Sequence, residues 1–439
     1  MRSNEPRIGG AKVSSGAPRP DAPAPFARRL LRHRGFLGFV AQDALSATAT
    51  SVAGVVVTWY VFVSTGSAID VGIVALAESL AAVGASLPAG TWVDRYDRRH
   101  LLIAAHAVRA AAFVLLAAFA LRLGFVLTPL VAVVMAWTVA SELRRSTSYA
   151  YLPDVVEPGE LADANGIDRA ATSTVQAVSG AVGGGIIATV GVVFGFAYAA
   201  LAYGIAALAT VLLLVRRPLP LGAGPSDQAP KEGMLSSIRH GLRWLISQRG
   251  LWQLSLSAMV FNFLFAATFT YLVVYVVQGL AAGPEIFGIL LGTYAAGYVV
   301  GSMAMGRTRA LRYTGRIWVL GYGGLGGLFL VLMGVFPSLL VALVASTAIG
   351  VAIGFSGNAW LTASQNLVPA PLRGRYFAID GVLSFVSGPP AIAVGAILVS
   401  AVGAVPTFTI AGIVMLGSTL GFAVLRPLWT LDGRPRAAP

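Results

Sequence analysis

Long apolar segments recur along almost the whole chain, with short polar stretches between them. A helix that crosses a lipid bilayer needs roughly 20 predominantly apolar residues. Twelve segments are of that kind, at residues 36–63, 71–93, 101–121, 127–151, 170–192, 194–215, 251–277, 287–305, 317–336, 339–361, 376–399 and 405–425. Lipid satisfies no backbone hydrogen bonds, so such segments fold as helices. The sequence therefore predicts an all-α integral membrane protein with twelve transmembrane helices.

Composition excludes several other classes of protein. Only 11% of the residues are charged, whereas soluble domains carry about 25%. The formal net charge of +13 would suggest nucleic acid in a soluble protein, but here the charge lies between apolar segments. The absence of cysteine excludes disulfides and cysteine-ligated metals. We expect no cofactor, no metal, no nucleic-acid partner and no enzymatic activity.

The basic residues are distributed unevenly between the loops. All Lys and Arg residues except Arg109 and Arg122 lie in the N-terminal tail, in or around every second loop, or in the C-terminal tail. Cytoplasmic loops of membrane proteins carry an excess of such residues. We therefore expect a multi-pass protein of the inner or plasma membrane, in contact with membrane lipids and with both termini in the cytoplasm.

One long polar stretch separates two groups of six predicted spans. The expected domains are a disordered basic cytoplasmic tail (1–35), an N-terminal six-helix bundle (36–215), a cytoplasmic linker (216–250), a C-terminal six-helix bundle (251–425) and a cytoplasmic tail (426–439). In the linker, Ile238, Leu242 and Leu245 share one helical face, which indicates an amphipathic helix on the membrane surface. A solvated linker helix remains the alternative.

The loop after the second span carries the most specific motif, GTWVDRYDRR from Gly90 to Arg99. It resembles the signature loop of the major facilitator superfamily, and its DRYDRR form resembles the branch with macrolide-efflux and enterobactin-export proteins. LPDVVEPGELADANGI from Leu152 and QNLVPAPLRGR from Gln365 resemble the same branch. RGFLGFVAQ at Arg34 also recurs weakly as RGLWQLSLS at Arg249, as expected for two related bundles. The resemblance implies a transporter of two pseudo-symmetric six-helix bundles, and a monomer.

The same resemblance implies that this loop belongs to a cytoplasmic latch. A carboxylate such as Asp94 can cap a neighbouring helix, while basic residues of the loop pair with acids on adjacent helices. We expect Arg144 to pair with this loop as well, although a plain basic turn remains the alternative. The candidate latch residues are Gly90, Asp94, Arg95, Arg98, Arg99, Glu142, Arg145 and Asp380.

The fifth span departs from a pattern of the superfamily. Antiporters often carry G-P-x-x-G-G there, whereas this chain reads GAVGGG from Gly180, with Ala181 in place of proline. The departure weakens the inference of antiport. Gly180 and Gly184 still form a GxxxG pair, which predicts close helix packing.

Ionisable residues inside a membrane are costly and mark function. Asp43, in the first span, is our candidate for the proton or cation site, with a structural hydrogen-bonding role as the alternative. Arg109 needs a counter-charge, for which Asp43 and Glu78 are candidates, in a structural ion pair or a substrate contact. His106 lies on the same face, as a proton relay or a packed histidine. The proton-coupling candidates are Asp43, Glu78, His106 and Arg109.

Spans one, four, seven and ten line the cavity in this fold. The candidate substrate contacts there are Trp59, Trp137, Phe261, Asn262, Phe265, Ser356, Asn358 and Trp360. Aromatic groups with a few amides suit an amphipathic small molecule. The leading hypothesis is proton-coupled efflux of a drug, antibiotic or siderophore by alternating access. A uniporter, importer or lipid flippase on the same fold, or a transporter-derived receptor or scaffold, are the alternatives. No G-x-x-x-x-G-K-[ST] motif supports an ATP-driven pump.

Overall fold

The computed structural model describes residues 34–156, 161–214, 234–306, 308, 310–369 and 372–434, and these residues contain helices and no strand. Among them, twelve helices are long and apolar enough to cross a membrane, which confirms the predicted all-α architecture. The predicted tails and the first part of the linker, at residues 1–33, 215–233 and 435–439, lie outside the described residues.

The first six spans are single helices. They are α2 (Arg34–Thr65), α3 (Ala68–Arg95), α4 (Arg98–Arg122), α5 (Leu127–Val155), α6 (Leu161–Val190) and α7 (Val192–Leu213). At the start of α3 the Ser67 hydroxyl accepts from the Asp70 N–H, and Gly191, with φ of 89°, joins α6 to α7. Helix α6 begins well before residue 170, where the sequence predicted its start, so Asp168 belongs to a span and not to a loop.

The remaining chain forms a second group of spans, several of which are interrupted. A helix of the linker, α8 (Met234–Ser247), precedes this group. The elements of the group are α9 (Arg249–Phe269), α10 (Leu272–Val274), η2 (Tyr275–Gly279), α11 (Pro284–Gly306), η3 (Ala310–Tyr313), α12 (Thr314–Ile317), η4 (Trp318–Leu325), α13 (Gly326–Val335), α14 (Leu339–Leu367), α15 (Arg373–Val386), α16 (Gly388–Val402), α17 (Ala404–Ala423) and α18 (Arg426–Trp429). The ninth span contains a π-helical stretch, η4, and the eleventh breaks at Ser387, just before Pro389 and Pro390. Proline removes a backbone donor and so favours such a break.

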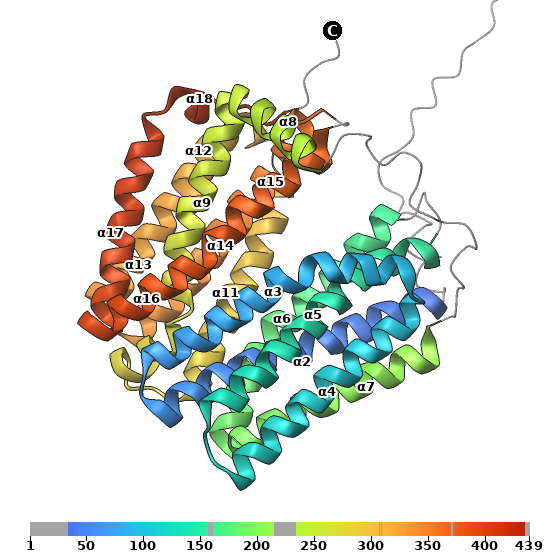
Figure 1. Ribbon diagram of the computed structural model, residues 1–439. Coiled ribbons are helices and arrows are strands. Elements are labelled where there is room, and N and C mark those ends of the chain that lie inside the picture. The colour runs from blue at the N-terminus through green and yellow to red at the C-terminus, as the bar shows by residue number, and fades with distance from the viewer. Residues whose placement is uncertain are drawn as a thin grey trace, which may run out of the picture.

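The two groups lie side by side and touch mainly at one end (Figure 1). We call the end at which α2, α4 and α9 begin the basic end, and the opposite end, where α2 ends and α11 begins, the distal end. At the distal end α6 packs on α11 and α3 on α16. Glycines permit this approach: a Cβ at Gly180 would stand 3.0 Å from the Gly288 carbonyl oxygen. The GxxxG pair therefore packs as predicted.

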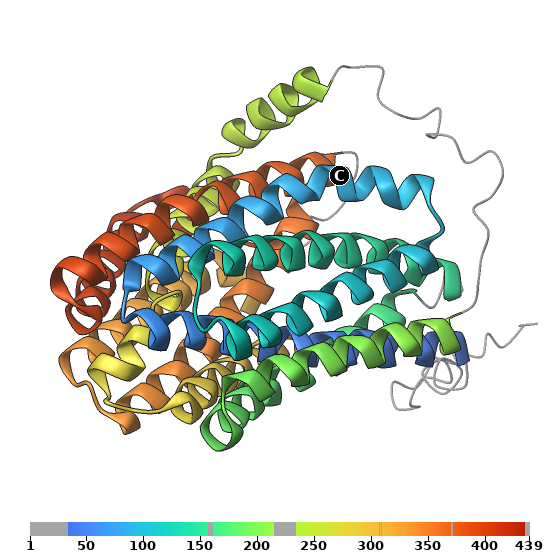
Figure 2. The same cartoon turned by 60° about the horizontal axis from the view of Figure 1, so that its bottom comes forward.

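Helix α8 lies outside both groups at the basic end, where Figure 2 shows it in yellow-green beside the bundle. Its Leu245 is fully buried, and Leu242 and Trp244 pack against the same hydrophobic core. The helix contacts α9 and α15. Leu242, Trp244 and Leu245 of α8 are thus turned towards the second group of spans.

Candidate functional site

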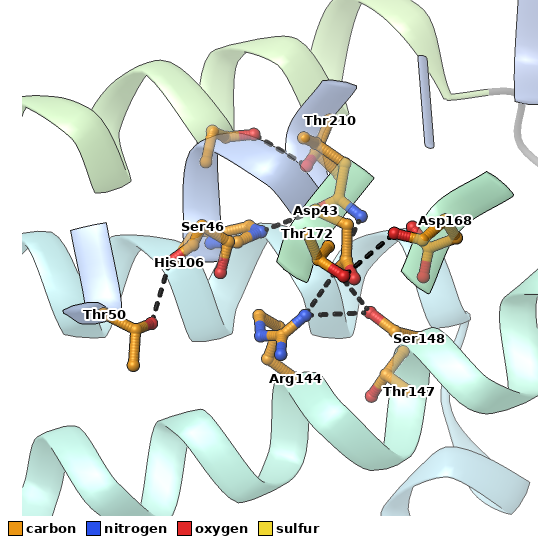
Figure 3. Close-up of polar contacts among 12 residues, drawn as sticks. Asp43, Ser46, Thr50, His106, Arg144, Thr147, Ser148, Asp168, Thr172 and Thr210 are labelled. Atoms are coloured by element: carbon orange, nitrogen blue, oxygen red, sulfur yellow. Dashed lines mark hydrogen bonds and ion pairs between the residues drawn. The ribbon is translucent and has the colours of Figure 1, made fainter. Parts of the chain in front are cut away.

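Asp43 and Arg144 form an ion pair inside the first group of helices (Figure 3). Asp43 is 9% exposed and lies on α2, and Arg144 reaches it from α5. The Ser148 hydroxyl lies 3.3 Å from the same Asp43 oxygen and also accepts from Arg144. Arg144 was expected to pair with the Asp94 loop, and the structure places it with Asp43 instead. A membrane-embedded acid is thus matched by a neighbouring cation.

Arg109 is fully buried and is held by hydroxyls and an aromatic ring. Its guanidinium donates to Ser46 Oγ at 2.8 Å and to Thr50 Oγ1 at 2.5 Å, and its Cζ lies 3.9 Å from the Tyr203 ring centroid. Among the described residues it pairs with no carboxylate. The expected ion pair with Asp43 or Glu78 is therefore not formed, because Asp43 is taken by Arg144.

His106 connects to the acid through one amide. Its Nε2 lies 2.9 Å from Gln42 Oε1, and Gln42 Nε2 donates to Asp43 at 3.4 Å. An amide oxygen only accepts hydrogen bonds, so His106 Nε2 is protonated and donates this hydrogen bond to Gln42 Oε1. The three side chains form a continuous buried chain from α4 to the ion pair, the arrangement expected either of a relay or of a packed histidine.

A small cavity of about 250 Å³ opens beside the ion pair. Its walls come from α2, α5 and α6, and they include Asp43, Arg144, Asn165, Asp168 and Thr172. Most of these groups are polar, and a water molecule takes about 30 Å³ of liquid volume. The cavity therefore has room for water beside Asp43, as a proton-accepting site requires.

A larger cavity of about 670 Å³ lies against the second group of helices. Arg169 of α6 lines both cavities, so they adjoin. Four of the predicted substrate contacts line the larger one, namely Asn262, Phe265, Asn358 and Trp360. Its other aromatic walls, which the sequence analysis missed, are Tyr294, Tyr298, Trp318 and Tyr322.

The other predicted contacts lie elsewhere. Phe261 is buried behind the cavity against Tyr322 and Phe422, and the Ser356 hydroxyl donates to the Ala352 carbonyl within its own helix. Trp137 donates to the Tyr203 hydroxyl at 3.0 Å inside the first group. Trp59 packs on Phe287 across the two groups at the distal end. In each case helix rotation turns the side chain away from the cavity.

Glu78 lines a third cavity, of about 300 Å³, near the distal end. The walls there also include Thr50, Phe269 and Phe287, from both groups of helices. None of the ion pairs among the described residues includes Glu78. Glu78 therefore forms no ion pair with Arg109, and Thr50 lines both this cavity and the cavity beside Asp43.

The loop after α3 is tied to its own group of helices. Arg98 pairs with Asp154 of α5 at 2.5 Å, and Arg99 donates to the carbonyl oxygens of Thr210 and Val211 at the end of α7. Arg98 thus meets an acid, as expected, whereas Arg99 meets a helix C-terminus. Arg95 is exposed, and a Cβ at Gly90 would meet open space.

Asp97 caps the helix that follows the loop after α3. Its carboxylate accepts from the His100 N–H at 3.0 Å and so caps α4. The side chain of Asp94 lies outside the described part of the structure. The acidic residue at position 97 therefore has a local structural role.

The remaining latch candidates occupy other places. Glu142 and Arg145 pair with each other on α5, 2.5 Å apart. Asp380 is 4% exposed, accepts from the Ser255 hydroxyl at 2.7 Å and lines the larger cavity. Asp380 was expected in the latch and instead forms part of a candidate substrate site.

Comparison with known proteins gives consistent matches over most of the chain. A family model described as Major Facilitator Superfamily matches residues 43–392. The multidrug efflux pump Tap of Mycobacterium tuberculosis (strain ATCC 25618 / H37Rv) is 28% identical over 410 residues, covering 90% of this chain and 94% of the relative. Tap of Mycolicibacterium fortuitum is 28% identical over 401 residues, covering 87% and 94%.

Solved structures agree in fold. A bacterial homologue of the human lysosomal transporter Spinster, inward-facing and unoccupied, gives a TM-score of 0.71 at 14% identity, covering 95% of this chain and 100% of that one. The D-xylose-proton symporter gives 0.68 at 15% identity, covering 93% and 100%. At these identities the likeness concerns the fold alone.

Proposed function

Since the chain belongs to the major facilitator superfamily, we propose that this transporter exports an amphipathic small molecule in exchange for protons. The single observation that carries the proposal is the buried Asp43–Arg144 pair, on the wall of a cavity that adjoins a larger aromatic one. Efflux as the direction is supported by the similarity to the multidrug efflux pump Tap.

The contact pattern supports alternating access. The excess of basic residues in alternate loops supports a cytoplasmic basic end. The two groups touch at the distal end, and the larger cavity has walls from both groups, Arg169 and Ser173 from α6 and the remainder from the second group. In this orientation the structure is the inward-facing member of the cycle, and rocking of the groups about the cavity would expose it to the other side.

Proton coupling rests on the competition between a proton and a guanidinium for Asp43. A carboxylate paired with Arg144 gives up that pair when it is protonated, because the neutral acid no longer attracts the cation. The cavity beside the pair gives protons access from water. Protonation thus changes contacts between α2 and α5, which is the kind of two-state element that couples an ion to a conformational change.

The larger cavity indicates the substrate class. Phe265 stacks with Phe269 at 5.0 Å and with Tyr294 at 5.7 Å, and Asn262 accepts from Tyr322 at 2.8 Å on the same wall. Apolar aromatic surface with a few placed amides fits ring-containing organic molecules. Drugs, antibiotics and siderophores are therefore the candidate cargoes.

The test is substrate-triggered proton movement in proteoliposomes loaded with a pH-sensitive dye. A panel of amphipathic drugs and siderophore-like compounds is screened with wild type, Asp43→Asn and a matched Asp70→Asn control. Asp70 lies in the first turn of α3, outside the cavity beside the ion pair. We expect proton movement in wild type and Asp70→Asn, and its loss in Asp43→Asn. Substrate movement without proton movement in wild type would instead indicate uniport.

A second candidate is transport of a lipid-like substrate. An apolar opening of about 370 Å³ lies between α3, α5 and the eleventh span, with the Glu142–Arg145 pair on its wall. Leu80 and Val386, which line it, are 55% and 63% exposed. Appearance of a fluorescent short-chain phospholipid in the opposite leaflet of proteoliposomes, lost in Val83→Trp, would favour this function over drug efflux.

A further inference from the structure

Two residues that line the cavity beside Asp43 each have a buried polar atom without a hydrogen-bond partner among the described residues. Arg144 Nε is buried and donates to none of the described residues. Asp168 Oδ1, on α6, is buried and accepts from none of them. Both residues line the same cavity of about 250 Å³. Arg144 and Asp168 therefore line one small polar space, and each has one buried polar atom without a partner among the described residues.

Asp168 is placed as a second acid for the same cation. Figure 3 shows Asp168 of α6 beside Asp43, on the side away from Arg144. Asp43 and Arg144 both lie close enough to affect it electrostatically. Thr172, one turn later, does not satisfy it, because its hydroxyl donates to the backbone carbonyl of Asp168 and not to the carboxylate.

We propose that Arg144 exchanges between two carboxylates, holding Asp43 when that acid is ionised and moving to Asp168 when Asp43 is protonated. The inference rests on the proposed function, in which Asp43 takes up the proton, and assigns Asp168 as a positioning residue for it. The structure shows the first arrangement, with Arg144 on Asp43.

The exchange keeps the buried Arg144 guanidinium paired with a carboxylate. An arginine inside a membrane protein needs a partner, since removing one member of a buried pair leaves an uncompensated charge. Protonation of Asp43 creates that situation for Arg144. Asp168 relieves it, because the carboxylate lines the same cavity and has a free oxygen. When Arg144 moves to Asp168, its contact passes from α2 to α6. Helix α6 packs on α11 at the distal end, and we call this contact the glycine seam.

A double-mutant cycle on the purified full chain tests the exchange. Thermal unfolding in detergent is compared for wild type, Asp43→Asn, Asp168→Asn and the double variant. Each single variant leaves one carboxylate for Arg144, whereas the double leaves none. We expect the double to lower the unfolding midpoint by more than the sum of the two single shifts, or to fail to fold while both singles fold. Such non-additivity is the signature of residues that share a partner.

Two further variants test whether the non-additive loss of stability depends on Arg144 and on a carboxylate. Asp43→Asn combined with Asp168→Glu should keep the midpoint of Asp43→Asn, because an acid is restored. Adding Arg144→Leu to the double variant should remove the excess loss. The Asp43→Asn and Asp154→Asn pair is the matched control and should be additive, since Asp154 pairs with Arg98.

Several outcomes would overturn the proposal: additive shifts, an Asp43→Asn single variant that fails to fold, or an excess loss that persists without Arg144. The cycle requires no transport. A positive cycle with no proton movement in proteoliposomes would therefore contradict the proposed coupling and leave the exchange intact, whereas an additive cycle with coupled transport would contradict the exchange alone.

Discussion

Gly184 of α6 lies directly against the carbonyl oxygen of Pro284, the first residue of α11. A Cβ at position 184 would overlap that oxygen and stand 3.1 Å from the Cα of Glu285. Gly180, one turn earlier, meets Gly288 in the same way. At these two glycines α6 thus meets α11 mainly through backbone atoms.

Replacing Gly184 should open this seam. Forcing a side chain into a packed contact costs about 1–3 kcal/mol, which corresponds to about 5- to 150-fold in a conformational equilibrium. The sequence has no cysteine, so a single Thr58→Cys, in the cavity near the distal end, reports without background. We expect faster thiol labelling of this cysteine in Gly184→Leu. Gly185→Leu is the control, because a Cβ there meets open space. Equal labelling rates in the two variants would contradict the role of Gly184 in closing the distal end.

Phe265 and Phe261 should separate binding from stability. They lie one turn apart on α9, but only Phe265 lines the larger cavity, and Phe261 packs in the core. An aromatic contact contributes about 0.5–1.5 kcal/mol. We therefore expect Phe265→Leu to raise the KM for an aromatic substrate about 2- to 12-fold with little change in thermal stability. Phe261→Leu should do the reverse, and the same pattern for both variants would contradict the placement of the cavity.

Asp97 should stabilise the protein as a helix cap. Loss of such a cap to alanine costs about 0.5–2 kcal/mol, whereas glycine costs only a few tenths. We expect Asp97→Ala to lower the thermal unfolding midpoint measurably and Asp97→Ser and Asp97→Gly to stay near wild type. A serine variant as unstable as the alanine variant would show that the carboxylate acts in some other way.

Tyr203 should hold Arg109 by its ring as well as by its hydroxyl. The hydroxyl bonds Thr50 at 3.2 Å and accepts from Trp137 at 3.0 Å. Tyr203→Phe removes these bonds, each about 0.5–1.5 kcal/mol. Tyr203→Leu also removes a cation–π contact of about 0.5–2 kcal/mol. The thermal unfolding midpoint should therefore be highest for wild type, lower for Tyr203→Phe and lowest for Tyr203→Leu. Equal midpoints for the two variants would exclude a contribution of the ring contact to stability.

The number and order of the spans could be predicted because hydropathy over about 20 residues is a local property of the chain. The interruptions within the ninth and eleventh spans were harder to predict. The break at Ser387 had a signal in the Gly388-Pro389-Pro390 run, which the prediction of one continuous span at 376–399 ignored. The π-helical stretch at Trp318–Leu325 offers only its glycines as a signal, and its geometry depends on packing against α14 and α17.

The site shows where sequence reasoning fails. Asp43 stood out because an acid within an apolar span is rare. Its partner did not, because Arg144 and Arg145 are adjacent and successive residues point about 100° apart on a helix. The rotation of α5 decides which one faces α2, and tertiary packing sets that rotation. Asp168 was missed because the span was predicted to begin at residue 170, whereas α6 begins at Leu161.

The glycine seam between α6 and α11 also affects the thermodynamics of opening. Glycine has no side-chain rotamers to lose, so closing the seam fixes few side chains and parting it frees few. The backbone groups there are already bonded within their own helices. Separation therefore leaves few broken hydrogen bonds behind, and the free energies of the closed and open forms can lie close together. A transporter with this seam can return to either form without repacking its core.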